Sequence, residues 1–422
     1  MNRGGRPALR PWRFIVAFGT VSLLADFVYE GARSVTGPLL ASLGASALVV
    51  GAVTGAGETA ALVLRLVSGP LADRTRRFWA WTIAGYTLTV VSVPLLGLAG
   101  VLWAACVLVV AERVGKAVRS PAKDTLLSHA TAATGRGRGF AVHEALDQTG
   151  ALIGPLVVAG MLALTHDAYG PSLAVLAAPG VATLAVLVWL RLRVPDPAGY
   201  ERAAGPTRWS TAPTEEEPPT GSGRRIPMER GFWAYAVFSG VTLAGVATFG
   251  VLSFHLVHHR LLPTAAVPLV YAAAMAVAAL AALATGWAYD RIGPRALAAL
   301  PLLAAAVPGL AFSTQVAAAV GGVLVWGAVM GVQESTLRAT VADLVPPGRR
   351  ATAYGLFAAV TGGAAFLGGL LSGALYDRSV HALILVTVAI QALALVLLLA
   401  GAAGHPVRFR SRRTPPRTRD RP

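Results

Sequence analysis

The sequence predicts an all-α membrane protein of twelve transmembrane helices arranged as two related six-helix bundles, and three observations support this prediction. Of the 422 residues, 55% are hydrophobic and only 13% are charged, and the mean hydropathy is +0.62. Soluble domains carry about 25% charged residues, so this composition excludes a water-covered surface. Apolar stretches of about 20 residues, enough to cross a bilayer core, recur along the chain. The two halves also share sequence patterns at matching positions.

Apolar stretches separated by polar loops mark the expected spans. The first stretch follows a basic start, as in a secretory signal peptide, and an Ala-Ser-Ala sequence begins at Ala45. It is too long for a signal peptide and carries Asp26, Glu30 and Arg33, so we expect an uncleaved first helix. The predicted spans are residues 14–43, 48–70, 78–98, 101–121, 139–165, 171–192, 231–257, 267–289, 297–312, 316–341, 352–376 and 380–403.

Basic residues collect in alternate loops. Thirty of the 36 Lys and Arg residues fall in one set of loops and tails, and only Arg260 and Arg378 fall in the opposite set. By the positive-inside rule, this distribution places both termini in the cytoplasm of a multi-pass protein of the inner (plasma) membrane. The net charge of +16 therefore reflects topology, and no basic face interleaved with aromatic residues indicates nucleic-acid binding. The single cysteine, Cys106, excludes an intramolecular disulfide.

A long polar connection divides the chain into two halves. We expect an N-terminal six-helix bundle at 1–193, a flexible Pro-rich cytoplasmic linker at 194–230, a C-terminal six-helix bundle at 231–404 and a basic tail at 405–422. The tail suits anionic lipid, and a specific partner is the alternative. Gly286 lies 217 residues after Gly69 in a matching Gly-x-x-x-Asp-Arg pattern, which indicates a duplicated six-helix unit.

The first of these patterns, Gly69-Pro-Leu-Ala-Asp73-Arg74-x-x-Arg77, resembles the signature G-x-x-x-D-R-x-G-R-R of the major facilitator superfamily. Arg76 stands where the second glycine belongs, whereas the second copy keeps that glycine as Gly293. A third similar stretch, at 373–378, falls on the opposite face and is not counted as a copy.

The resemblance implies two pseudo-symmetric bundles that move against each other in transport. In such loops an aspartate is able to pair with a cation or cap a helix N-terminus in one conformation only, which makes a conformational latch. A solvated turn with topology-setting charges is the alternative. The latch residues are Gly69, Asp73, Arg74, Arg77, Gly286, Asp290 and Arg291.

Two further stretches are similar to motifs of the same superfamily. Gly150-Ala-Leu-Ile-Gly154-Pro155 resembles the glycine-proline motif of its antiporters, although the small residues also suit ordinary helix packing. The run from Glu112 to Asp124 resembles the arginine motif of span 4.

Charged residues inside the spans are expensive, at about 2.5–3.5 kcal/mol each on insertion scales, so each needs a reason. We expect a proton-coupling site in the N-terminal half, in which carboxylates bind the proton and Arg113 acts as a counter-charge. Static buried ion pairs are the alternative, as is a metal site at His143, Glu144 and Asp147. The proposed transport residues are Asp26, Glu30, Arg33, Glu58, Arg113 and Asp147.

Together these features predict a monomeric, proton-coupled exporter of a small organic molecule. Its expected partners are the substrate, protons and the lipid bilayer, without nucleic acid, metal or another cofactor. Uptake by symport is the nearest alternative, and a non-transporting receptor or assembly factor on the same fold is another. No nucleophile–base pair or phosphate-binding loop indicates an enzyme.

Overall fold

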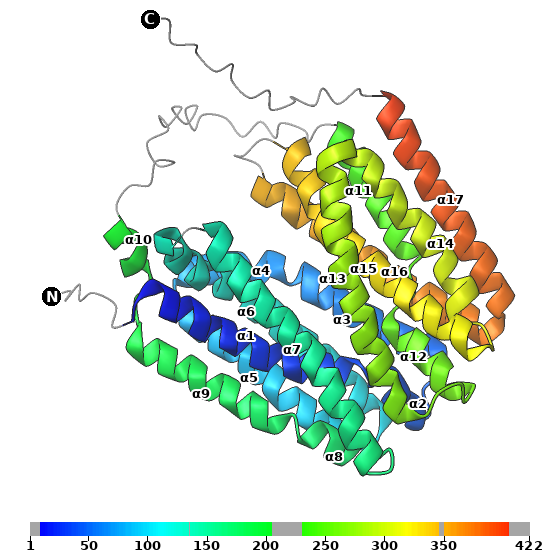
Figure 1. Cartoon of the computed structure of the whole chain (residues 1–422), viewed down its shortest axis with the longest axis horizontal. Helices are drawn as coiled ribbons and strands as arrows, with labels where there is room; N and C mark the ends of the chain where they lie inside the picture. Colours follow the sequence, from blue (N-terminus) through cyan, green and yellow to red (C-terminus); the bar gives the residue numbers. More distant parts are fainter. Residues whose placement is uncertain (1–8, 135, 205–229, 346–349, 405–422) are drawn as a thin grey trace, which may run out of the picture.

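The computed structural model describes residues 9–134, 136–204, 230–345 and 350–404. All regular structure in these residues is helical, and the helices run roughly side by side in two groups (Figure 1). The first group comprises α1 (Pro11–Arg33), α2 (Thr36–Ser42), α3 (Ala47–Val63), α4 (Arg65–Thr75), α5 (Phe78–Gly97), α6 (Leu102–Thr134), α7 (Arg136–Leu164), α8 (Tyr169–Ala174) and α9 (Ala177–Arg193). A short helix, α10 (Ala198–Ala204), follows it.

The second group forms the C-terminal half. It comprises α11 (Arg230–Ala244), α12 (Phe249–His258), η1 (Thr264–Ala266), α13 (Val267–Ile292), η2 (Gly293–Ala298), α14 (Ala299–Ala311), α15 (Val316–Leu344), α16 (Arg350–Arg378) and α17 (Val380–Gly404). Its core is one cluster that contains the fully buried Phe249, Tyr271 and Trp326. The predicted domain boundaries remain a prediction, since residues 205–229 and 405–422 lie outside the described part.

The predicted twelve-helix membrane fold is confirmed. Ten helical segments of the described chain are long and apolar enough to cross a membrane, and a shorter apolar helix covers Arg295–Ala311. The remaining predicted span is α6, which is apolar at its start and carries Glu112, Arg113, Lys116 and Arg119 further on. The twelve predicted spans therefore all correspond to helices.

Four predicted spans are interrupted, which hydropathy does not reveal. Breaks separate α1 from α2, α3 from α4, α8 from α9, and α11 from α12. A helix break frees carbonyl groups that need partners inside a membrane. At the α11–α12 break, Gln391 donates to the carbonyl of Thr242 (2.9 Å) and the Trp326 indole donates to that of Ala247 (2.9 Å). Neighbouring helices thus stabilise the interruption.

The two groups of helices pack against each other along α3 and α16, where Thr59 donates to the carbonyl of Gly362, and they close together at one end of the bundle (Figure 1). The start of α1 and the end of α17 lie at the opposite end, called here the terminal end, where the groups diverge (Figure 1). At the other end, the far end, α2 contacts α12 and α3 contacts α16. Glycines allow this approach: a Cβ at Gly51 would lie 2.0 Å from the carbonyl oxygen of Gly369.

Candidate functional site

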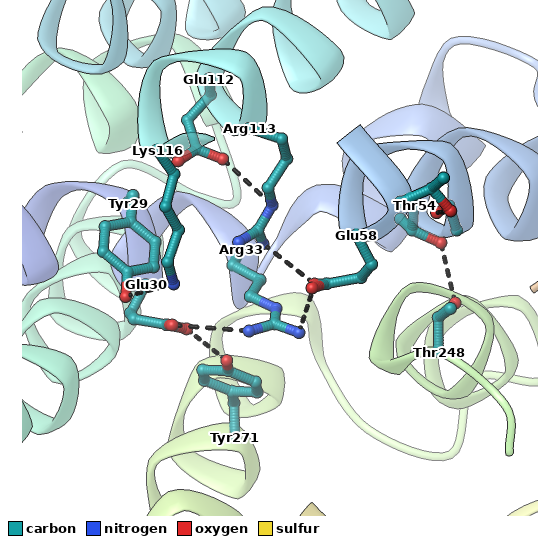
Figure 2. Close-up of polar contacts among 12 residues, drawn as sticks. Tyr29, Glu30, Arg33, Thr54, Glu58, Glu112, Arg113, Lys116, Thr248 and Tyr271 are labelled. Carbon is teal, nitrogen blue, oxygen red and sulfur yellow. Dashed lines mark hydrogen bonds and ion pairs between the residues drawn. The ribbon is translucent and has the colours of Figure 1, made fainter. Parts of the chain in front are cut away.

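A chain of ion pairs crosses the middle of the first group and reaches the second (Figure 2). Arg33 on α1 contacts Glu58 on α3 at 2.7 Å and Glu30, one turn earlier on α1, at 3.5 Å. Arg113 on α6 contacts the same oxygen of Glu58 at 3.6 Å. Tyr271 on α13 donates a hydrogen bond to Glu30, so the chain of contacts joins the two groups of helices.

Arg113 is held by a second carboxylate on its own helix. Its Nε lies 3.2 Å from Glu112, and Arg113 and Glu112 are 6% and 8% exposed. One Nη of Arg113 and one carboxylate oxygen of Glu112 have no hydrogen-bond partner among the described residues. Removing one member of a buried pair typically costs about 3–5 kcal/mol, so these contacts stabilise the charges inside the membrane.

A second polar chain runs beside the first, from α6 through α1 to α7. Lys116 donates to the Tyr29 hydroxyl (2.9 Å) and its ammonium lies 4.4 Å from the centre of the Tyr29 ring. Tyr29 in turn donates to Asp26 (3.1 Å), and the carboxyl of Asp147 on α7 lies close to that of Asp26. Two neighbouring carboxyl groups inside a membrane favour holding one proton between them, because two like charges there repel each other. The pair can therefore hold a single shared proton.

Two glycines of α7 bring this carboxyl pair together. A Cβ at Gly150 would lie 2.0 Å from the carbonyl oxygen of Leu23, and one at Gly154 would lie 2.2 Å from that of Phe27. Any larger residue would push α7 away from α1. The packing interpretation of this motif is confirmed, Pro155 follows within the same helix, and the antiporter interpretation stays a prediction.

The structure separates His143 from Glu144, two of the three residues that suggested a metal site. His143 is buried and hydrogen-bonds Ser22 (2.8 Å), whereas Glu144 is exposed and accepts from Gln148 (3.0 Å). A metal site at His143, Glu144 and Asp147 requires that their side chains point together, and this is wrong for His143 and Glu144, because these consecutive positions face different sides of the helix. Among the described residues, no group of three His, Cys, Asp or Glu side chains is arranged to hold a metal ion.

In the family signature, the second glycine stands where the helix ends with a positive φ. Arg76 ends α4 with φ 50° and ψ 20°, in the left-handed region, and Gly293 ends α13 with φ 63°. A residue with positive φ commonly terminates a helix, and glycine adopts it without strain. Arg76 does so with a side chain, which explains how the motif persists after losing its glycine.

The latch contacts are not visible in the described part. Asp73 and Arg74 are exposed, and Asp73 forms no hydrogen bond or ion pair with a described residue. The side chain of Asp290 lies outside the described residues, while the guanidinium of Arg291 stacks 3.5 Å from the Trp287 ring centre. The latch role therefore remains a prediction.

Some residues of the site are not among the transport residues chosen from the sequence. Lys116 and Arg119 continue the charged stripe of α6, and this spacing is the signal that could have included them. Arg119 lies over the ring of Tyr86 at 4.3 Å and over that of Tyr29 at 5.5 Å. Tyr271 gave no comparable signal, because it is a neutral residue in an apolar span of the other half.

The chain matches a known family of membrane proteins over most of its length. The family model of the Major Facilitator Superfamily matches residues 21–369 and 262–421. An uncharacterized protein of Mycobacterium tuberculosis (strain H37Rv) is 62% identical over 395 residues, covering 94% of both chains. An uncharacterized MFS-type transporter of Methanocaldococcus jannaschii is 26% identical over 184 residues, 44% of this chain and 46% of that one.

Solved transporter structures share the fold. The nucleoside transporter NupG superposes with a TM-score of 0.67 at 14% identity, over 92% of this chain and 98% of that one. The peptide transporter POT, in complex with sulfate, gives 0.71 at 16% identity over 93% and 94%. A bacterial homolog of the lysosomal transporter Spinster, in an inward-facing and occupied conformation, gives 0.69 at 14% identity over 94% and 98%.

Proposed function

This chain belongs to the Major Facilitator Superfamily, a family of membrane transporters and not of enzymes, and we propose that it is a proton-coupled exporter of a small organic molecule. Transport would proceed by alternating access, in which the two groups of helices rock about a central site. The observation that carries the proposal is the closeness of two carboxyl groups, those of Asp26 and Asp147, inside the membrane.

A proton-coupling site has to bind and release a proton in each transport cycle. With the proton present, the carboxyls of Asp26 and Asp147 attract each other; without it, two like charges repel in a poorly hydrated site. Tyr29 donates to Asp26, and Lys116 donates to Tyr29, so loss of the proton would strengthen the attraction of this chain for Asp26. Protonation thereby changes the packing preference of α1, α6 and α7.

The ion-pair chain offers a route from this site to the other group of helices. Glu30 lies one turn beyond Asp26 on α1 and accepts from Tyr271 of α13. A movement of α1 therefore acts on a contact between the two groups. Arg33 and Glu58, which hold Glu30 in place, have side chains that are 24% and 29% exposed, as expected for groups beside a substrate path.

Export is favoured by the glycine-proline stretch of α7, which resembles that of antiporters, and the loop at Asp73 would act as the latch at the terminal end. If the charge distribution sets the orientation, this end faces the cytoplasm. Replacing Asp73 by Asn should impair transport and shift the ratio of the two conformations, with expression near normal. Unchanged flux and distances would reduce the loop to a topology signal.

The test uses proteoliposomes that contain the pH dye pyranine, with the membrane potential clamped at zero by potassium and valinomycin. Nucleosides and dipeptides are the first external probes, since NupG transports nucleosides and POT transports peptides, followed by amphiphilic organic compounds. A transported compound that exchanges for protons makes the interior alkaline, whereas a symported one makes it acidic.

The dye signal thus separates the proposal from its rivals. An alkaline change that Asp26→Asn abolishes, and that Glu144→Gln on the exposed side of α7 leaves intact, supports export by proton exchange. An acidic change would contradict export and show that the protein takes up its substrate together with protons. Transport of a labelled compound without any pH change contradicts proton coupling.

A further inference from the structure

Besides the contact between Glu30 and Tyr271, an aspartate joins the two groups of helices at the far end. Asp377, at the C-terminal end of α16, accepts the backbone N–H of Ala47 at 3.1 Å with one carboxylate oxygen. Its other oxygen accepts the N–H of Leu48 at 2.9 Å. Both donors begin α3, so a carboxylate of the second group caps a helix of the first.

The contact satisfies groups that a helix cannot satisfy itself. The first N–H groups of an α-helix lack partners within the helix and carry partial positive charge, which favours a nearby carboxylate. Within the first group, the hydroxyl of Ser46 accepts only the N–H of Val49, at 3.4 Å. Asp377 thus supplies from across the interface the charge that α3 lacks locally.

Glycine brings Asp377 within reach. A Cβ at Gly373, one turn before Asp377, would lie 2.3 Å from the carbonyl oxygen of Ala47, so only glycine allows α16 this close. Gly373 and Asp377 have the same spacing as Gly69 and Asp73 of the family signature. Residues 373–378 are not counted as a copy of the signature because they fall on the opposite face. The close approach of α16 to α3 nevertheless gives their similarity a structural basis.

The second group holds the end of α16 in place. His255 of α12 hydrogen-bonds the carbonyl of Ser313 through Nε2 (3.1 Å) and the hydroxyl of Tyr376 through Nδ1 (2.9 Å). Since only an N–H can donate to a carbonyl, Nε2 carries the hydrogen, and Nδ1 of a neutral ring accepts from Tyr376. These two hydrogen bonds fix the position of Tyr376, and its neighbour Asp377 is therefore held where it reaches the start of α3.

We propose that Asp377 is a latch residue of the transport cycle, which closes the far end of the substrate path by capping α3. The acceptor and both donors belong to different groups of helices, so the contact must break when the far end opens. Asp377 is exposed and borders a hollow of about 520 Å³, so water can replace its partners and the contact is reversible. The proposal rests on alternating access and not on proton coupling.

The test measures distances between spin labels at both ends of the full-length protein in nanodiscs, in a Cys106→Ala background. One label pair, at Ser42 and His381, spans the two groups at the far end. Another, at Ala80 and Arg295, spans them at the terminal end. All four positions are exposed.

Asp377→Asn keeps the shape of the side chain and removes its charge. We expect the ratio of closed to open far-end distances to fall about fivefold, in line with one charge at a helix terminus. The terminal-end pair should shift in the opposite sense. Asp167→Asn, an exposed acid at the far end within the first group, should change neither ratio.

An independent variant removes one donor instead of the acceptor. Ala47→Pro abolishes an N–H that bonds Asp377, and proline suits the first position of a helix after the extended Ser46 (φ −76°, ψ 166°). It should open the far end as well, and combining it with Asp377→Asn should add less than the sum of the two shifts.

Equal distance distributions in wild type and Asp377→Asn overturn the proposal, as does an equally large shift in Asp167→Asn. A wild type with one far-end distance at every pH contradicts alternating access and hence both proposals. A wild type with two far-end distances whose ratio ignores pH contradicts proton coupling alone.

Discussion

Replacing Asp26 by Asn should uncouple transport from the pH gradient while leaving the protein folded. Asn retains the size of the side chain and its hydrogen-bonding capacity toward Tyr29 and Asp147. It cannot gain or lose a proton, and Asp147 loses the neighbouring carboxylate whose repulsion favours proton uptake, so the pair stays in its ionised state. Substrate should still exchange down its own gradient, because only the coupling step requires titration.

The magnitude follows from the number of protons that the site holds. In the proposed function, Asp26 and Asp147 hold one proton between them. One proton crossing a gradient of one pH unit supplies about 1.36 kcal/mol, which is a tenfold concentration ratio. With zero membrane potential, wild type should therefore accumulate substrate up to about tenfold per pH unit on the acidic side, and Asp26→Asn should not accumulate it at all.

The assay measures accumulation of a labelled substrate, identified in the pyranine screen, at pH differences of zero, one and two units. Counterflow without a gradient shows that the variant still binds and exchanges substrate. Glu144→Gln is the matched control, because it removes an exposed acid one turn away on α7. Tenfold accumulation by well-folded Asp26→Asn would refute the reasoning. A hundredfold ratio per unit in wild type would refute the single shared proton.

Three further predictions concern stability and topology. Arg33→Ala should lower the free energy of unfolding by about 3 kcal/mol, near the lower limit for a broken buried pair because the site is partly hydrated. A thiol-reactive dye that labels Cys106 on unfolding measures this change. An unchanged unfolding midpoint would show that the ion pairs contribute nothing to stability. Arg76→Gly should raise the free energy of unfolding by about 1 kcal/mol by relieving the left-handed backbone, and a lower midpoint in the same assay would contradict this explanation. Cysteines introduced at Ser210 and Ser411 in a Cys106→Ala background should resist impermeant thiol reagents in intact cells, and labelling without permeabilisation would break the predicted topology.

Hydropathy and charge predicted the fold class well, because crossing a membrane imposes a length and an apolar composition on each helix. The helix breaks escaped prediction. Those after α1 and α11 contain no proline, and at the second Gln391 and Trp326 satisfy the freed carbonyls from distant positions. Such partners become visible only when the helices are packed.

The sequence indicated which charged residues lie inside the membrane, but not which residues they contact. Asp26, Glu30 and Arg33 are four and three residues apart, a spacing that places them on one helical face, but this spacing does not show that Asp26 faces Asp147 while Glu30 faces Tyr271. Those partners are set by how α1 contacts α7 and α13. Asp377 lies in the stretch at 373–378 that is not counted as a copy of the signature, and its capping contact could not be predicted because it depends on a helix start more than 300 residues away.

The length of α6 has a mechanical consequence. At 33 residues, α6 is about 50 Å long, whereas a bilayer core is about 30 Å thick, so one part of the helix must project beyond the membrane. The projecting part holds α10, through a contact of 2.8 Å between His129 and Glu201, and Tyr200 of α10 bonds the carbonyl of Leu9 (2.8 Å). A small tilt of α6 within the membrane is therefore magnified at its tip. An antibody fragment raised against α10 would serve as a pointer whose angle reports the state of the transporter in single-particle images.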